Sequence, residues 1–452
     1  MNEEYSVKIE KMLSNGAGLA RINGMSVFIN DAAPDDTVKI KITKRNKSYF
    51  EGAVLEIEKP SEYRIKPLCA LSKVCGSCDW QHIAYDEQLR QKKQIIEETL
   101  KKIAGIDINS APVIPSPKIE QYRCKVQLPY AQTKVSKRLL SGYYKKKTHE
   151  LVNIKYCPMQ PEIINEINEF IKENAAGVSG YDEKTGKGLL RHIIYRISSD
   201  LKQILIIFVI NSDVIDKSLK NLSKMLIEKY PQITGISANF NTKKTNVITG
   251  DKTRTISGND YYIETLNGFK YKVSSSSFFQ VNPYCAEYLF SRVKELIVQR
   301  VQKPSILDAY AGVSSFGVQL SSIAEKITCI EEIKSASRDA EENLKLNNIS
   351  NITVINGDAA LEFEKLCRAA VKFDVSIIDP PRSGCAAGAL EYLSKLTSKY
   401  IIYVSCNPSS AARDIKILKE KGFELEYVQG IDMFPNTCST EMISVLKLNL
   451  AG

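Results

Sequence analysis

The sequence predicts an α/β fold in which the last part of the chain forms a doubly wound sheet with mainly parallel strands. From about residue 271 onward, short apolar runs alternate with stretches of helical periodicity, which is the rhythm of successive strand–helix–strand units. Before residue 60 the pattern differs, because apolar residues there alternate with lysines at every second position. The segment between these two regions mixes strands with a few helices. We therefore expect three domains, covering residues 1–60, 61–270 and 271–452.

The composition fits a chain of this kind with an anionic partner. The 452 residues are 43% hydrophobic and carry a net charge of +10, which favours RNA or DNA over an uncharged partner. The longest apolar run, Ile204 to Ile210, is too short to cross a bilayer, and residues 1–8 lack the apolar core of a signal peptide. We therefore expect a cytoplasmic protein with no membrane partner. Eleven cysteines in such a chain are not expected to form a disulfide framework.

The N-terminal domain is expected to be a small β-barrel. Val38, Ile40 and Ile42 alternate with lysines after the turn at residues 33–36, and glycines punctuate the earlier strands. This pattern fits an oligonucleotide-binding type of barrel. The residues Lys59-Pro60-Ser61 mark its expected end.

The middle domain is expected to be mixed α+β. A charged run from Tyr85 to Ile103 has apolar residues at helical spacing, and strands are expected at Ile193–Ile197 and Gln203–Ile210. In the last domain we expect strands at Ser305–Ala309, Lys326–Ile330, Ile352–Ile355, Val375–Ile378, Ile401–Val404 and Ile443–Leu448.

Three of these strand ends carry residues suited to a nucleoside. Ligands on such sheets lie beyond the carboxyl ends of the strands. The first strand runs into residues 308–317, which contain Gly312 but no G-x-G-x-x-G motif for a pyrophosphate. The second ends at Glu331, whose carboxylate can accept hydrogen bonds from ribose hydroxyls, and the third ends at Asn356-Gly357-Asp358, suited to an adenine edge. Together they indicate S-adenosylmethionine, a nucleoside cofactor without a pyrophosphate.

The next two strand ends carry reactive side chains. Asp379-Pro380-Pro381-Arg382 is a stiff turn that holds its aspartate and arginine in fixed orientation. Cys406 follows the strand Ile401–Val404, and the only histidines, at positions 82, 149 and 192, lie far from it in the sequence. A Cys–His hydrolase is therefore disfavoured. Read with the turn at Asp379 and with Glu441, Cys406 suggests a thiolate that adds to a pyrimidine ring, whereas alone it would read as a buried apolar residue.

A second group of cysteines has the spacing of a metal site. Cys69, Cys75 and Cys78 lie close together, and Cys157 follows much later before a proline. A Cys-x2-Cys pair suits zinc and an iron–sulfur cluster equally well, and free thiols are a third possibility. The spacing Cys-x3-Cys-x2-Cys of radical S-adenosylmethionine enzymes is absent.

Several of these motifs together resemble the RNA uracil-5-methyltransferase family. The likeness extends over nearly the whole chain, including an N-terminal barrel of the TRAM type. It is carried by Phe279-Gln280-Val281-Asn282-Pro283, Asp308-x-Tyr310-x-Gly312, Asp379-Pro-Pro-Arg382, Ser405-Cys406-Asn407-Pro408 and Glu441. The resemblance implies a Rossmann-like class I methyltransferase domain that methylates carbon 5 of a uridine in RNA.

The resemblance also implies roles for individual residues. Cys406 would be the nucleophile and Glu441 the base, although residues 437–440, Thr-Cys-Ser-Thr, stand where relatives often carry a histidine. The implied contacts to S-adenosylmethionine are Gln280, Tyr310, Ser315, Glu331, Asp358 and Asp379. The implied ligands of a [4Fe-4S] cluster, present in a large subset of the family, are Cys69, Cys75, Cys78 and Cys157.

The RNA substrate is left with alternatives. The barrel and the cysteine set resemble the ribosomal RNA branch, so 23S ribosomal RNA is the expected substrate and transfer RNA the alternative. A different class of hypothesis is an RNA-binding iron–sulfur assembly factor that has lost turnover, against which the intact Cys406 and Glu441 argue. We expect the enzyme to act as a monomer.

Overall fold

The computed structural model describes residues 4–449, which form two compact units. Unit 1 runs from the start of the described chain to Ser116, and also holds Asp379–Ser394 and the residues from Lys399 onward. Unit 2 holds Pro117–Ile378 and the short segment Lys395–Ser398. Unit 1 thus combines segments from the two ends of the chain, whereas each of the three expected domains is continuous in sequence. The boundaries of the expected domains stay a prediction. No helix in the described range is long and apolar enough to span a membrane.

The N-terminal part of unit 1 is a six-stranded sheet that curls around a small apolar core. Its strand order is β1-β5-β6-β4-β3-β2, and β1 also lies beside β3, so the sheet bends back on itself as a barrel does. The buried residues are those at alternate positions of the strands, such as Val38 and Ile40, as the lysine alternation predicts. The strands are β1 Glu4–Lys8, β2 Lys11–Met12, β3 Gly18–Ile22, β4 Met25–Ile29, β5 Thr37–Arg45 and β6 Tyr49–Lys59.

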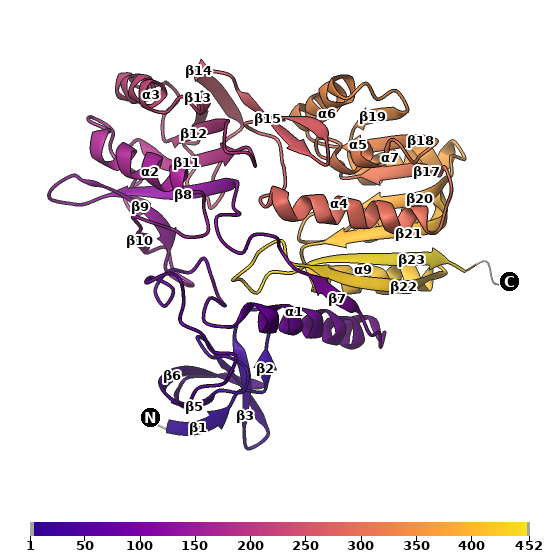
Figure 1. Cartoon of the computed structure of the whole chain (residues 1–452), viewed down its shortest axis with the longest axis horizontal. Coiled ribbons are helices and arrows are strands. Elements are labelled where there is room, and N and C mark those ends of the chain that lie inside the picture. The colour runs from indigo at the N-terminus through magenta and orange to yellow at the C-terminus, as the bar shows by residue number, and fades with distance from the viewer. Residues whose placement is uncertain (1–3, 450–452) are drawn as a thin grey trace. The chain divides into compact units, whose positions relative to one another are not determined.

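The rest of unit 1 joins an N-terminal helix to C-terminal strands. Helix α1 (Tyr85–Thr99) continues as a π-helical turn to Ala104 and ends at Gly105, so the predicted helical run at 85–103 is confirmed. Its strands follow the order β21-β23-β22-β7, with β23 antiparallel to both neighbours and β7 parallel to β22. The elements are β7 Ala111–Ile114, α8 Ala387–Leu396, β21 Thr397–Ser405, α9 Pro408–Glu420, β22 Phe423–Ile431 and β23 Glu441–Leu448. Helices α1 and α9 pack against each other (Figure 1).

Unit 2 begins with a seven-stranded sheet whose central strands are buried throughout. Every residue of β11 (Leu190–Ile197) and β12 (Ile204–Ile210) is buried, and helices α2 (Glu162–Asn174) and α3 (Lys217–Lys229) cover one face of the sheet (Figure 1). The order is β10-β9-β8-β11-β12-β13-β14. The remaining strands are β8 Lys125–Gln132, β9 Leu139–Tyr144, β10 Leu151–Asn153, β13 Ile233–Phe240 and β14 Lys252–Gly258.

The second part of unit 2 is a parallel array of the kind that the alternating pattern predicts. Strands β19, β18, β17 and β20 lie in that order and all pair in parallel. A hairpin, β15 (Tyr261–Leu266) and β16 (Phe269–Ser274), and helix α4 (Pro283–Val298) precede them. The array consists of β17 Ser305–Ala309, α5 Ser315–Leu320, β18 Lys326–Glu331, α6 Lys334–Leu346, β19 Ile352–Asn356, α7 Ala359–Arg368 and β20 Phe373–Ile378. The predicted α/β class with a small N-terminal sheet is confirmed.

Candidate active site

Cys406 lies at the point where a buried strand turns into a helix. Residues 401–404 of β21 are fully buried, and Cys406, two positions beyond them, is half-buried. Asn407 is the N-cap of α9, since its side-chain Oδ1 accepts a 3.1 Å hydrogen bond from the Ser409 N–H, and Pro408 occupies the first turn. The thiol therefore stands next to the positive end of a helix dipole, which favours its ionised form.

The turn that begins at Asp379 is held against the same helix. The Asn407 side-chain amide donates to the Arg382 carbonyl oxygen at 2.9 Å, which ties the turn to the residue after the nucleophile. The buried Asp414 of α9 accepts hydrogen bonds from the Cys385 N–H at 2.8 Å and from the Tyr403 hydroxyl at 2.7 Å. These supporting residues were missed from the sequence, although an asparagine before a proline is a recognisable N-cap signal.

Glu441 begins the strand that pairs with the end of β21. Ser405 lies opposite Met442 in this antiparallel pair, so the next residues outward on the two strands are Cys406 and Glu441. Glu441 is only 4% exposed. Because the residues are 35 positions apart in the sequence, only the strand pairing brings them together.

Helix α1 anchors the loop that leads to Glu441. The Lys92 ammonium forms a fully buried ion pair with Asp432 at 2.5 Å and also donates to the Phe434 carbonyl oxygen at 3.1 Å. The Gln88 side-chain oxygen accepts a hydrogen bond from the Asn436 N–H at 2.9 Å. A lysine and a glutamine in a charged helix gave no sequence signal of this role.

Four charged or reactive side chains influence one another at this edge of unit 1. Burial, followed by the negative charge of Glu441, raises the pKa of the Cys406 thiol, whereas the Arg382 guanidinium lowers it. Burial raises the pKa of Asp379 to about 7. Burial and then Asp379 raise the pKa of Glu441 well above its usual range, while Arg382 again acts in the opposite direction. The site thus combines a nucleophile, two carboxyl groups with raised pKa values, and the Arg382 cation.

These pKa shifts predict that a reaction through the Cys406 thiolate and a Glu441 carboxylate speeds up as pH rises. Both pKa values are raised, so both reactive, deprotonated forms are depleted at low pH and recovered as pH increases. We expect the single-turnover rate to climb between about pH 6 and 8.5. Rates measured under saturating ligand, with binding checked at each pH, test this, and a profile that falls over that range would contradict it.

The residues assigned to S-adenosylmethionine border the carboxyl ends of the parallel strands in unit 2. Glu331 ends β18 and its carboxylate accepts hydrogen bonds from the Gly312 N–H at 2.8 Å and the Ile333 N–H at 2.7 Å. A carboxylate has lone pairs left for two hydroxyl donors, so this role is compatible with ribose binding. At Gly312 (φ +57°) an added Cβ would meet no atom within 4 Å, so this side of the loop has room for a ligand.

The other assigned residues lie on the same loops or the neighbouring ones. Tyr310 adopts a left-handed conformation (φ +62°) directly after β17, and Ser315 begins α5. Asp358 is exposed and caps α7 by accepting a hydrogen bond from the Leu361 N–H at 3.0 Å. Gln280 is half-buried in the segment before α4. Asp379 belongs to unit 1, and the contacts of all these residues with the cofactor stay a prediction.

The four cysteines proposed as cluster ligands are divided between the units. Cys69, Cys75 and Cys78 are half-buried in one irregular segment of unit 1, and Cys157 is buried in unit 2. Among residues 4–449, no three histidine, cysteine or acidic side chains are close enough to hold a metal ion. The segment that carries Cys69 is organised by its own turns and by the Gln81 side chain, which accepts from the Cys69 N–H at 3.0 Å.

Comparison with known proteins connects both units to RNA modification. Residues 84–448 match the family described as tRNA (Uracil-5-)-methyltransferase, and residues 2–55 match the TRAM domain. An uncharacterized RNA methyltransferase of Oceanobacillus iheyensis is 35% identical over 100% of this chain and 98% of its own length. One from Clostridium acetobutylicum is 36% identical over 99% and 97%, respectively.

One solved structure is similar to this chain over nearly its full length. It is the crystal structure of Pyrococcus abyssi tRNA (uracil-54, C5)-methyltransferase in complex with S-adenosyl-L-homocysteine. The two chains are 26% identical with a TM-score of 0.75, and the alignment covers 98% of this chain and 100% of that one. The product of methyl transfer from S-adenosylmethionine is thus bound by a protein of the same fold.

Proposed function

Since this chain belongs to the tRNA (uracil-5-)-methyltransferase family and carries a TRAM domain, we propose that it methylates carbon 5 of a uridine in RNA by covalent catalysis through Cys406. The family and its relatives are RNA methyltransferases that use S-adenosylmethionine. The observation that carries the covalent mechanism is the end of the β21–β23 pair, where Cys406 and Glu441 come out next to each other with Asp379 and Arg382 close enough to shift their pKa values.

The proposed role of Cys406 is to activate carbon 5 of the uracil ring. Carbon 5 of uracil is too weakly nucleophilic to take a methyl group unaided. A bond from the Cys406 sulfur to carbon 6 moves the ring electrons toward carbon 5 and the carbon 4 oxygen, and makes carbon 5 an enolate-like nucleophile. S-adenosylmethionine, when bound, supplies the methyl group.

Glu441 completes the cycle. After carbon 5 has gained the methyl group it still carries its proton, and that proton must leave before the ring can recover its double bond. The Glu441 carboxylate takes the proton, the electrons of the C–H bond form the double bond, and the sulfur–carbon 6 bond breaks to release the thiolate. Arg382 lowers the pKa of both groups and thereby favours the ionised forms that these steps require.

We propose 23S ribosomal RNA as the substrate and transfer RNA as the second candidate. The TRAM domain and the cysteine set support ribosomal RNA, whereas the similarity to the Pyrococcus abyssi transfer RNA enzyme supports the alternative. Mapping 5-methyluridine in ribosomal and transfer RNA from a deletion strain, and restoring it with purified enzyme, decides between them. Unchanged 5-methyluridine in both RNAs would overturn the proposed function. We further propose that the enzyme is a cytoplasmic monomer.

We also retain the [4Fe-4S] cluster on Cys69, Cys75, Cys78 and Cys157 as a proposal. It is supported by the Cys-x2-Cys motif and by the incomplete burial of Cys69, Cys75 and Cys78. In a [4Fe-4S] cluster each thiolate binds a different iron, so the four sulfurs need not converge on one point as ligands of a single ion do.

The cluster proposal predicts the metal content of the protein. Protein purified without oxygen should be brown and contain about four iron atoms per chain. Cys75→Ser should lose most of this iron, whereas Cys285→Ser, which alters a buried cysteine of α4, should retain it. Stoichiometric zinc with no iron in anaerobic preparations would contradict the cluster.

A further inference from the structure

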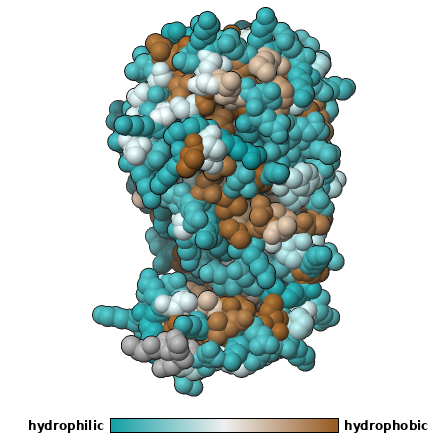
Figure 2. Space-filling view, turned by 90° about the vertical axis from the view of Figure 1, so that its left-hand side faces the viewer, coloured by the Kyte–Doolittle hydropathy of each residue, from teal (hydrophilic) through white to brown (hydrophobic). Residues whose placement is uncertain are grey.

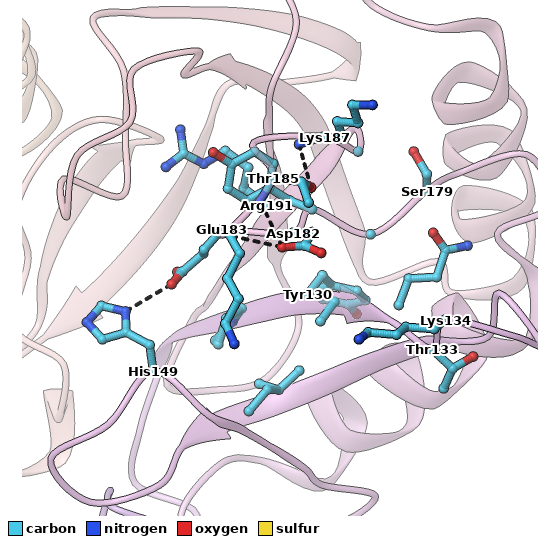
Figure 3. Close-up of a pocket in the computed structure, with 18 of the residues that line it drawn as sticks. Tyr130, Thr133, Lys134, His149, Ser179, Asp182, Glu183, Thr185, Lys187 and Arg191 are labelled. Carbon is cyan, nitrogen blue, oxygen red and sulfur yellow. Dashed lines mark hydrogen bonds and ion pairs between the residues drawn. The ribbon is translucent and has the colours of Figure 1, made fainter.

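Unit 2 contains a large cavity that none of the residues assigned above lines. It has a volume of about 1550 Å³ and lies among the segments 129–137, 144–151 and 179–192; we call it the central cavity (Figure 3). Pockets for small ligands usually measure about 300–1,000 Å³. The central cavity is therefore large enough for a ligand longer than a single nucleotide.

A β-bulge brings two adjacent side chains to this cavity. In a regular strand neighbouring residues face opposite sides of the sheet. In β11, Leu190 pairs with Ile210 and His192 with Val209, so Arg191 is an extra residue without a counterpart. Bulges of this kind redirect side chains and are common near functional sites. Arg191 and His192 consequently both line the cavity.

Both side chains are buried with a polar atom left unpaired. Arg191 is 6% exposed, and its Nη1 donates to the carbonyl oxygens of Asn241 and Lys243 at 2.7 and 2.8 Å. Its guanidinium lies 4.7 Å over the Tyr181 ring, yet its Nε has no partner among the described residues. His192 is 8% exposed and its Nδ1 is likewise unpaired there.

These two nitrogens are shielded from solvent and cost stability, whereas other atoms of the two residues line the cavity. Burial and the charge of Arg191 lower the pKa of His192 to about 4, so its imidazole is neutral at pH 7 and can accept as well as donate. The pair thus presents a permanent donor and an amphoteric group, which together suit the polar edge of a nucleobase or a phosphate oxygen.

The walls of the cavity add aromatic rings. The rings of Tyr144 and His149 lie 5.4 Å apart, and both side chains hydrogen bond to Glu183, at 2.9 and 3.0 Å. Figure 3 shows His149 and Glu183 pointing toward one another. The carboxylate therefore holds two flat groups of the lining in a fixed orientation.

The lining of the cavity is basic on balance, because four lysines and Arg191 outnumber the acidic residues Glu150, Asp182 and Glu183. Four exposed lysines line the cavity, at positions 134, 137, 184 and 187. The tip that carries the last two is ordered, because an Asp182 side-chain oxygen accepts the N–H groups of Lys184 and Thr185 at 2.8 and 3.2 Å. Stacking rings within a basic groove are how proteins bind unpaired RNA. The surface turned to the viewer in Figure 2 is mostly hydrophilic, with apolar residues in separate patches.

We propose that the central cavity binds a short unpaired segment of the substrate RNA, apart from the uridine that is methylated. A base stacks on the Tyr144–His149 wall, an acceptor of the base or backbone reaches Arg191 and His192, and the lysines hold the flanking phosphates. This inference rests on the proposed function and extends it by giving the enzyme a second RNA contact. A free mononucleotide has the same chemistry, so the experiment must separate the two sources.

The test compares RNA binding by two variants of the full-length protein, each of which has lost two lysines. Lys184→Ser/Lys187→Ser removes two lysines at the cavity, and Lys220→Ser/Lys224→Ser removes two exposed lysines of α3 that do not line it. The probe is a random-sequence single-stranded RNA that contains 4-thiouridine. The cavity pair should weaken binding about tenfold and flatten the salt dependence by about 1.4 in log–log slope, and the α3 pair should change neither.

Variants of Tyr144 and ultraviolet cross-linking provide two further, independent tests. Tyr144→Ala should weaken binding at least about fivefold, and Tyr144→Phe, which keeps the ring, should not. Ultraviolet cross-links should map to residues 129–137, 144–151 and 179–192 and should resist competition by uridine monophosphate. Equal effects of the two lysine pairs, cross-links only elsewhere, or displacement by the mononucleotide at low concentration would each overturn the proposal.

These measurements need no methyl transfer. If the proposed function failed and no uridine were methylated, the cross-links would still report whether the cavity binds RNA. In the active enzyme the Lys184→Ser/Lys187→Ser pair should raise KM for RNA and leave kcat and S-adenosylmethionine binding unchanged.

Discussion

Replacing Cys406 with alanine is expected to abolish methyl transfer to RNA, with a loss of roughly a thousandfold or more, as seen when a covalent nucleophile is removed. The thiol acts on the uracil ring, and without it carbon 5 stays too weak a nucleophile. The assigned S-adenosylmethionine residues lie mostly on loops of unit 2, so cofactor affinity should change little. Transfer of a radiolabelled methyl group and calorimetric binding of the cofactor measure the two effects.

A matched cysteine separates loss of the nucleophile from loss of a thiol in general. Cys367 of α7 is also half-buried but lies outside the site, so Cys367→Ala should retain normal activity. If Cys406→Ala turned over at a rate near that of the native enzyme, the covalent mechanism would be wrong, and another way of activating carbon 5 would be required.

Glu441→Gln is expected to stop the reaction one step later. Glutamine keeps the shape of the side chain but cannot take the carbon 5 proton, so the methylated ring should remain bonded to Cys406. We expect a protein–RNA complex that survives denaturing electrophoresis and contains the new methyl group. The double variant Cys406→Ala/Glu441→Gln should form none of it, and release of methylated product at the native rate by Glu441→Gln would assign the base to another group.

The stability of the Glu441→Gln variant tests whether the substitution impairs folding. Glu441 is buried beside Asp379, and its raised pKa means that its ionised form is disfavoured in the folded protein. The folded state therefore loses stability relative to the unfolded state as pH rises above the ordinary pKa of a glutamate. Replacing the carboxyl with a neutral amide should raise the free energy of unfolding at pH 7.5 by about 1 kcal/mol. A trapped adduct in a protein that is no less stable cannot be explained by misfolding.

The fold could be predicted where the pattern is local. The lysine alternation predicts the N-terminal sheet, and apolar runs predict the parallel strands, because burial on both faces leaves an unbroken apolar signature. Strand β22 (Phe423–Ile431) was missed because glutamates interrupt its apolar residues, and β7 (Ala111–Ile114) because only its pairing with a strand more than 300 residues later makes it a strand.

The site could be predicted in its reactive residues but not in its supports. A cysteine before Asn-Pro and a glutamate at a strand start are visible in the sequence. The anchoring of the loop before Glu441 by Lys92 and Gln88 depends on which face of α1 meets that loop, which periodicity alone does not determine. The bulge at Arg191 could not be predicted either, because an extra residue in one strand is defined only by its pairing with the neighbouring strand.

Asn407 has one consequence for how the catalytic parts move. Its oxygen fastens it to α9 and its amide fastens the Arg382 backbone, so the nucleophile's turn and the Asp379–Arg382 turn are linked through a single side chain. We expect a small thermal displacement of one turn to shift the other turn as well, because both are bonded to the same side chain. We therefore expect the backbones of Cys406 and Arg382 to keep their spacing when either turn moves.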